Sequence, residues 1–199
     1  CIDKYRGDWP EVELDLTGGF NFAPLPALAR GDLDLVITAD PLPISGIAYI
    51  PLFRYEAMLA LDRHHPLSLK EWVEPEDLSD QVLITYPVER ERLDVFTRFL
   101  DPASVEPESI RTAELTPMMV QLVASGRGTA CLPNWALMEY VDNQIIVARK
   151  LGEHGIWATL YAAIREDQKD AAFIEDFLAT AEDTCFSNLS GIKAVNVET

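Results

Sequence analysis

Short apolar runs and segments with helical spacing alternate along most of this chain. Runs that are apolar, or that alternate between apolar and polar residues, predict strands over residues 11–16, 33–38, 46–63, 81–86, 108–114, 128–133, 144–151 and 157–165. Helical spacing and helix-start signals cover residues 23–30, 75–78, 88–100, 116–128, a short stretch from Pro133, and 171–186. Strands that alternate with helices predict an α/β fold with parallel sheets and right-handed crossovers.

A polar, turn-rich stretch at residues 68–80 interrupts this rhythm and predicts a crossing between two lobes. We therefore assign residues 1–75 and 152–186 to subdomain I, residues 76–151 to subdomain II, and residues 187–199, which lack periodicity, to a tail. Two α/β lobes of this kind enclose a cleft, which is a natural site for a small molecule.

The charge of the chain argues against direct binding of nucleic acid. Lys and Arg total 16 against 33 Asp and Glu, which gives a formal charge of −17, and so acidic a surface repels phosphate backbones. No apolar run approaches the roughly 18 residues of a membrane span. The three cysteines Cys1, Cys131 and Cys185 are widely spaced, which favours a reduced, cytoplasmic compartment. Cys131 lies in an apolar run and is predicted to be a buried core residue.

The strand at 33–38 ends in a segment that is suited to a ligand. Thr38, Ala39 and Asp40 follow the apolar run directly, and Pro41 fixes the chain after them. Ligands of open α/β sheets bind at strand ends, and a carboxylate there can bind a ligand ammonium. A local turn made by the side chain of Asp40 is the alternative.

The second lobe offers groups that suit an anion. Tyr86, Pro87 and Val88 follow a strand and lead into the helix predicted at 88–100, and Thr116 caps the helix predicted at 116–128. The free N–H groups of a helix start attract an anion such as a carboxylate. Two helix starts and one carboxylate across a cleft fit an amino-acid zwitterion.

Other chemistry finds little support in the sequence. His64 and His65 are adjacent and would point to opposite faces of a strand, so no histidine pair has the spacing of metal ligands. The stretch TGGFN at 17–21 lacks the glycine pattern and the lysine of a phosphate loop. We expect no catalytic residues, no metal and no cofactor. A lyase on the same fold would have to use Asp40, Tyr86 or Cys131.

Three motifs together resemble the effector-binding domain of LysR-type transcriptional regulators. They are WPEVELDL followed by LARGDLDLVIT, HHPL followed by EDL, and LVASGRGTACLP. The segments TADPLPISGIAYIPLFRYE, YPVERERLDVF and LGEHGIWATLYAAIR are similar to members of this family that respond to homocysteine and control methionine biosynthesis genes.

The resemblance implies a periplasmic-binding-protein-like fold of type 2, with two Rossmann-like subdomains and an effector in the cleft. It implies an antiparallel homodimer, a tetramer for the full-length protein, and DNA binding only through an N-terminal winged helix-turn-helix domain that is absent from this chain. The effector-facing residues that it implies are Gly18, Gly19, Phe20, Asn21, Thr38, Ala39, Asp40, Tyr86, Pro87, Val88, Thr116 and Pro133. The alternative function is a solute-binding protein of an amino-acid transporter.

Overall fold

The chain passes twice between two structural units. The structure, a computed structural model, describes residues 1–18 and 23–195. Unit 1 comprises Cys1–Arg54 and Thr159–Thr199, and unit 2 comprises Tyr55–Ala158. The crossings lie inside the long strands β2 (Ile47–Leu61) and β8 (Ile156–Arg165), not in the polar stretch at 68–80. Residues 55–75 belong to unit 2 because the second half of β2 pairs there with β6 and β7.

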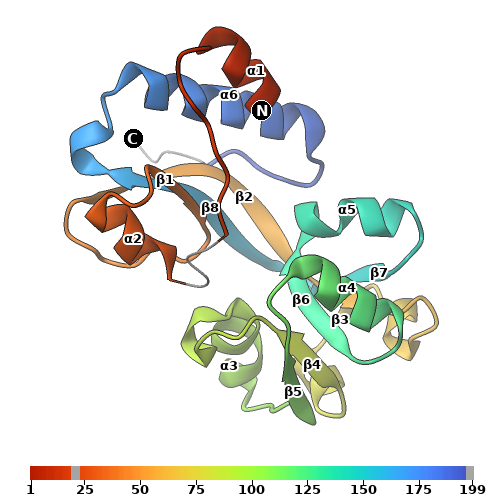
Figure 1. The fold of residues 1–199 in the computed structure, drawn as a ribbon. Coiled ribbons are helices and arrows are strands. Elements are labelled where there is room, and N and C mark those ends of the chain that lie inside the picture. The colour runs from red at the N-terminus through yellow and green to blue at the C-terminus, as the bar shows by residue number, and fades with distance from the viewer. Residues whose placement is uncertain (19–22, 196–199) are drawn as a thin grey trace. The chain divides into compact units, whose positions relative to one another are not determined.

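Unit 1 is built on three neighbouring strands, in the order β1 (Leu35–Thr38), β8 and β2. Helix α2 (Pro24–Arg30) packs Leu25 and Leu28 against one face of these strands. It begins with Pro24 and ends at Gly31, whose φ of 86° is the left-handed conformation expected of a glycine after a helix. Helices α1 (Ile2–Asp8) and α6 (Ala172–Asn188) lie together on the other face (Figure 1).

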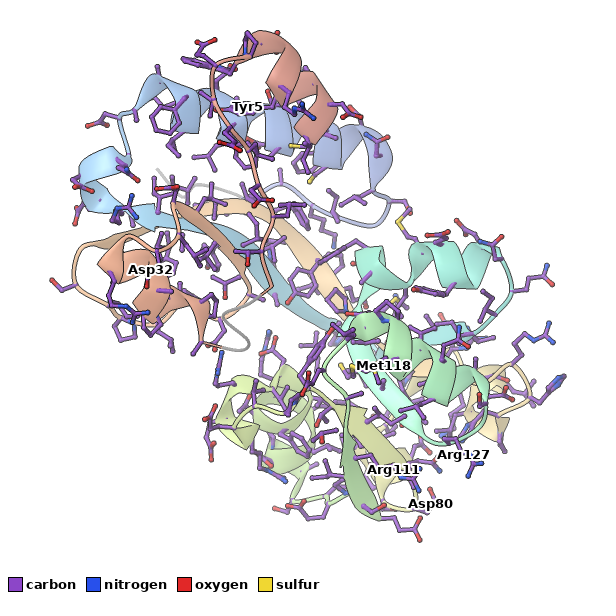
Figure 2. All side chains as sticks on the ribbon, viewed as in Figure 1. Tyr5, Asp32, Asp80, Arg111, Met118 and Arg127 are labelled. Carbon is purple, nitrogen blue, oxygen red and sulfur yellow. The ribbon has the colours of Figure 1, made fainter. Side chains whose placement is uncertain are left out.

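The contact between α1 and α6 centres on Tyr5, which is 2% exposed. The hydroxyl of Tyr5 donates to the carbonyl of Phe173 at 2.8 Å, and its ring meets that of Phe177 edge to face at 5.2 Å. The indole N–H of Trp9 donates to Asp176 at 2.8 Å. These contacts fix the first eight residues to the last helix of the same unit (Figure 2).

Unit 2 has a sheet with a helical layer on each face. The second half of β2 is followed across the sheet by β6 (Thr129–Pro133), β4 (Val82–Thr85) and β5 (Ser109–Thr112), while β7 (Val147–Leu151) pairs with β2 and with β3 (Trp72–Val73). Leu83 faces a core that includes Phe96 and Leu100, next to the short helix α3 (Asp101–Ala103). Ile84 faces the opposite core, which α4 (Thr116–Ala124) and α5 (Asn134–Asp142) cover (Figure 1).

The sheet is mixed, so the expectation of parallel sheets is only partly right. The pairs β4–β5, β4–β6 and β3–β7 are parallel, as crossover helices require, whereas β1–β8, β2–β6 and β2–β7 are antiparallel. The antiparallel pairs all involve the two long crossing strands. The connection from β7 to β8 is a short turn with glycine at Gly152 and Gly155, both at positive φ, and no helix separates these strands.

The strand predicted at 11–16 is absent. Val12 and Leu14 are half-buried and Glu13 and Asp15 exposed, so the alternation survives. These residues nevertheless belong to no strand, because no neighbouring strand supplies a ladder of hydrogen bonds. Residues 12–18 instead line one side of a cavity of about 660 Å³ in unit 1, opposite β1 and α6.

The helix predicted at 88–100 is interrupted at Leu93, and a helical stretch follows over residues 94–103. Arg90–Arg92 form one 3₁₀ turn and Phe96–Leu100 a π-helical segment. Between them Leu93 is extended, with φ of −106° and ψ of 108°, and this ends the first turn. The hydrophobic spacing survives because Val95, Phe96, Phe99 and Leu100 all enter the core. The part of the predicted helix that carries the apolar residues is therefore present.

Two predicted coverings also differ. The near-continuous apolar run at 33–38 predicts a strand covered on both faces. Val36 packs under α2, yet Ile37 is 49% exposed because it lines the cavity of about 660 Å³ in unit 1. The near absence of polar residues at 116–124 predicts a helix buried on every side. Met118, labelled in Figure 2, is nevertheless 53% exposed, since only the side with Met119, Val120 and Val123 meets the sheet. Across the described residues, none of the helices combines the length and the apolar character that crossing a membrane requires.

Candidate functional site

The predicted ligand groups of unit 1 lie where β1 ends. Thr38 is the last residue of β1 and is paired with Tyr161 of β8, so its backbone is held by the sheet. Its hydroxyl oxygen accepts from the N–H of Asp40 at 3.0 Å. The side chain of Thr38 therefore helps to shape this turn. Asp40 is half-buried and Ala39 exposed.

A tyrosine supports the loop that carries Asp40. The hydroxyl of Tyr49 donates to the carbonyl of Leu42 at 2.6 Å, and its ring meets that of Tyr161 edge to face. Burial raises the pKa of Tyr49, and the negative charge of Asp40 raises it further. Tyr49 thus keeps its proton and holds the loop in place at neutral pH.

Of the predicted effector-facing residues Gly18 to Asn21, the structure describes only Gly18. Gly19, Phe20 and Asn21 lie outside the described residues. Gly18 is exposed and lines the cavity of about 660 Å³ in unit 1. That cavity is lined mainly by residues 12–18, by β1 and by aromatic side chains of α6, and Thr38, Ala39 and Asp40 do not line it.

The predicted residues of unit 2 gather at one end of its parallel strands. Tyr86 follows β4, Thr116 follows β5 after a short turn, and Pro133 ends β6, and these three strands are neighbours in the sheet. Because β5 and β6 both run parallel to β4, their carboxyl ends meet at the same edge. The hydroxyls of Tyr86 and Thr116 lie 2.5 Å apart and form a hydrogen bond.

The backbone amides that we expected to bind an anion are mostly used. Val88 begins no helix, and its N–H donates to the carbonyl of Tyr86 at 2.9 Å. In α4, Pro117 has no N–H, and the N–H groups of Met118 and Met119 both donate to Leu115. Thr116 is the first residue of α4 rather than its cap, which is Leu115. Beside Val88 and the start of α4, the hydroxyls of Tyr86 and Thr116 are therefore better placed as donors than the backbone amides.

Trp135 is a candidate that the sequence analysis missed. It follows Pro133 at the start of α5, and its indole N–H is buried without a hydrogen-bond partner among the residues that the structure describes. Buried donors are normally paired, so this N–H is available to a ligand oxygen or a water. The sequence signal was weak, since one tryptophan after a strand is equally typical of a core.

The Tyr55 hydroxyl and the Cys131 thiol of unit 2 stay protonated at neutral pH. Burial, and then the negative charge of Asp94, raise the pKa of the Tyr55 hydroxyl. The same two causes raise the pKa of the Cys131 thiol to about 12. Cys131 packs against the core that contains Leu59 and Leu83, but it is half-buried and so less buried than the apolar pattern predicted. A thiol that holds its proton so firmly is a poor nucleophile.

The Cys131 assignment predicts a slow thiol reaction. With its pKa near 12, the thiolate fraction at pH 8 falls by about a thousandfold relative to an ordinary cysteine. We expect an aromatic disulfide reagent at pH 8 to label the exposed Cys1 quickly and Cys131 at least a hundredfold more slowly. In denaturant all three cysteines should react alike. Equal native rates for Cys1 and Cys131 would contradict the assignment.

Among the described residues, no group of three or more His, Cys, Asp or Glu side chains is placed to hold a metal ion. What the two units offer is one carboxylate at a strand end in unit 1, and hydroxyl and indole donors at a strand end in unit 2. Within each unit, these are groups that can form hydrogen bonds with a small polar molecule.

Comparison with known proteins identifies the protein family of this chain. The family model described as "LysR substrate binding domain" matches residues 1–185, and the chain belongs to this family. Its fold is the mixed α/β, periplasmic-binding-protein-like fold of type 2 that the sequence motifs predicted.

Relatives named MetR match nearly the whole of this chain. The chain is 40% identical over 194 residues to the HTH-type transcriptional regulator MetR of Escherichia coli strain K12, and 36% identical over 197 residues to MetR of Haemophilus influenzae. These matches cover 98% and 99% of this chain but 61% and 63% of the relatives' length. The regulatory domain structure of MetR from N. meningitidis superposes with a TM-score of 0.84 at 36% identity, covering 98% of this chain and 90% of that one.

Proposed function

We propose that this chain is the ligand-sensing domain of a MetR-type transcriptional regulator of methionine biosynthesis genes. The similarity to MetR over 98% of the chain carries the proposal. DNA is bound by a part of the longer protein that this chain does not include, which agrees with the charge of −17. The protein acts in the cytoplasm as a homodimer, or as a tetramer at full length. A transporter's solute-binding protein is not favoured, since the compared relatives are regulators.

Homocysteine is the proposed effector. Asp40 would pair with the ammonium group, since a half-buried carboxylate at a strand end forms a strong charge-assisted hydrogen bond. The hydroxyls of Tyr86 and Thr116 share one hydrogen bond, and the hydroxyl whose proton is not used in it would donate to the ligand carboxylate in place of the amides that are already used. The ligand then shifts the equilibrium toward the state that it binds better.

Calorimetric titration of this chain with L-homocysteine tests the proposal. Methionine, cysteine and serine are the comparison ligands, because they keep the zwitterion and change only the side chain. Selective binding of homocysteine supports the proposal. Equal binding of all four, or binding of none, overturns the choice of effector and leaves the family assignment in place.

The role of Tyr86 predicts a loss of affinity on substitution. Tyr86→Phe removes one hydroxyl and keeps the ring, and a hydrogen bond to a charged group contributes about 2 kcal/mol. We expect the dissociation constant for homocysteine to rise about thirtyfold, measured by the same titration. Tyr140→Phe on α5 is the matched control and should bind normally. Unchanged affinity in Tyr86→Phe would assign the carboxylate to other groups.

A further inference from the structure

The residues after α6 are bonded to one of the two crossing strands. Helix α6 ends at Asn188, and Gly191, with φ of 71°, lets the chain turn. Lys193 then lies antiparallel to Arg54 of β2. The N–H of Arg54 donates to the carbonyl of Lys193 and the N–H of Lys193 donates to the carbonyl of Arg54, each at 2.8 Å. The predicted tail is therefore tied to the sheet at this point.

Apolar side chains accompany this bridge. Leu189, Ile192 and Val195 are half-buried, whereas Ser190, Gly191, Lys193 and Ala194 are exposed. The segment thus lies with one side against the protein. We call residues 189–195 the strap.

The bridge between Lys193 and Arg54 lies where β2 passes from unit 1 to unit 2. Arg54 is the last residue of unit 1 on β2, and Tyr55 is the first residue of unit 2. Only two covalent crossings join the units, at Arg54–Tyr55 and at Ala158–Thr159. Any movement of one unit relative to the other must change backbone dihedral angles near these residues. Because Lys193 forms hydrogen bonds with both the N–H and the C=O of Arg54, it restrains the backbone of Arg54.

The strand is also tightly packed just past the crossing. Glu56 is 8% exposed although its side chain is a carboxyl group. A Cβ atom added to Gly155 would come within 2.0 Å of its carboxylate oxygen, so the β7–β8 turn closes directly over it. β2 is therefore held on both sides of the crossing, by the strap at Arg54 and by the turn at Glu56.

We propose that the strap is a clamp that stiffens the crossing of β2, and that its release frees movement of the two units. The link to ligand sensing rests on the proposed function, whereas the clamp itself does not. With the strap bonded, Arg54 keeps its strand geometry. When the strap leaves, two backbone hydrogen bonds are lost at the point where β2 must bend.

Backbone hydrogen exchange tests the clamp. Lys193→Pro removes the N–H that donates to Arg54, and Lys193→Ala keeps the backbone and is the matched control. We expect at least tenfold faster exchange of the Arg54 amide in Lys193→Pro, extending to residues 55–57. Lys193→Ala, and the amides of α6 between Phe173 and Ala181, should exchange as in the unchanged chain. A chain that ends at Asn188 should reproduce the proline result.

Two outcomes overturn the clamp. One is unchanged exchange at Arg54 in both the proline variant and the shortened chain. The other is faster exchange that stops at Arg54, which would make the strap a cover for a strand edge and nothing more. Homocysteine titration of Lys193→Pro tests the link to sensing separately, with an expected change in affinity of threefold or more. If the unchanged chain binds no homocysteine, the proposed function fails while the exchange result still decides the clamp.

Discussion

Replacing Asp40 with asparagine should weaken homocysteine binding by about thirtyfold or more. The substitution keeps the size of the side chain and removes the charge that we propose pairs with the ligand ammonium. Loss of one partner of a hydrogen-bonded charge pair costs at least about 2 kcal/mol of binding free energy. The measurement is the calorimetric titration of Asp40→Asn at low salt, where screening is weakest.

The control for Asp40 is a carboxylate of the same unit. Asp32, which is labelled in Figure 2, pairs with Arg30 on the surface at 2.8 Å, and no ligand role is assigned to it. Asp32→Asn should therefore bind homocysteine as the unchanged chain does. Equal losses in both variants would point to the net charge of the protein rather than to a site. Unchanged affinity in Asp40→Asn would remove Asp40 from the proposed site.

Gly128→Ala should cost about 3 kcal/mol of unfolding free energy. Gly128 precedes β6 with φ of 150°, and a Cβ atom there would lie 2.5 Å from the carbonyl oxygen of Val82 and 3.2 Å from the side chain of Ile84. The near neighbour is strand backbone, so relief requires β4 and β6 to move apart. Overpacking and an unfavourable backbone conformation each cost about 1–3 kcal/mol. Urea unfolding followed by circular dichroism measures the loss.

Gly126→Ala separates the two causes. Gly126 also has a positive φ, of 65°, but a Cβ atom added there meets nothing within 4 Å. We expect this variant to lose about 1 kcal/mol, which is the backbone cost alone. Equal losses at both positions would mean that the contact with Val82 relaxes freely. In Gly128→Ala we also expect weaker ligand binding, because the β4–β6 register positions Tyr86 and Pro133.

Local sequence patterns predicted much of the fold. The α2 helix with its proline start and glycine end, α4 with its following glycine, and the strands β1, β4, β6 and β8 all lie where the patterns place them, within a few residues. These elements share one property: their signals come from residues close in sequence, such as the apolar run of 128–133 or the Pro117 and Gly126 that bound a helix. The loop at Thr38 was likewise visible as a strand end.

Other features depended on partners far away in the chain. The run EVELDL alternates as a strand should, but a strand also needs a neighbour, and no strand of the described structure pairs with it. The helix expected from Val88 begins only after the extended Leu93, and its Phe96 and Leu100 enter a core formed with residues distant in the chain. The state of the amides near Val88 and Met118 depends on backbone geometry that spacing does not encode.

The sequence by itself determined the family, the α/β class, most of the elements, and the strand ends where polar residues gather, because these follow from short-range spacing and from motifs. Only the tertiary structure decided the direction of the strands, the use of hydroxyls instead of amides beside Tyr86, the buried indole of Trp135, and the bond from Lys193 to Arg54. Each of these joins residues distant in sequence, and the free energy of such a contact depends on geometry that only the folded chain creates.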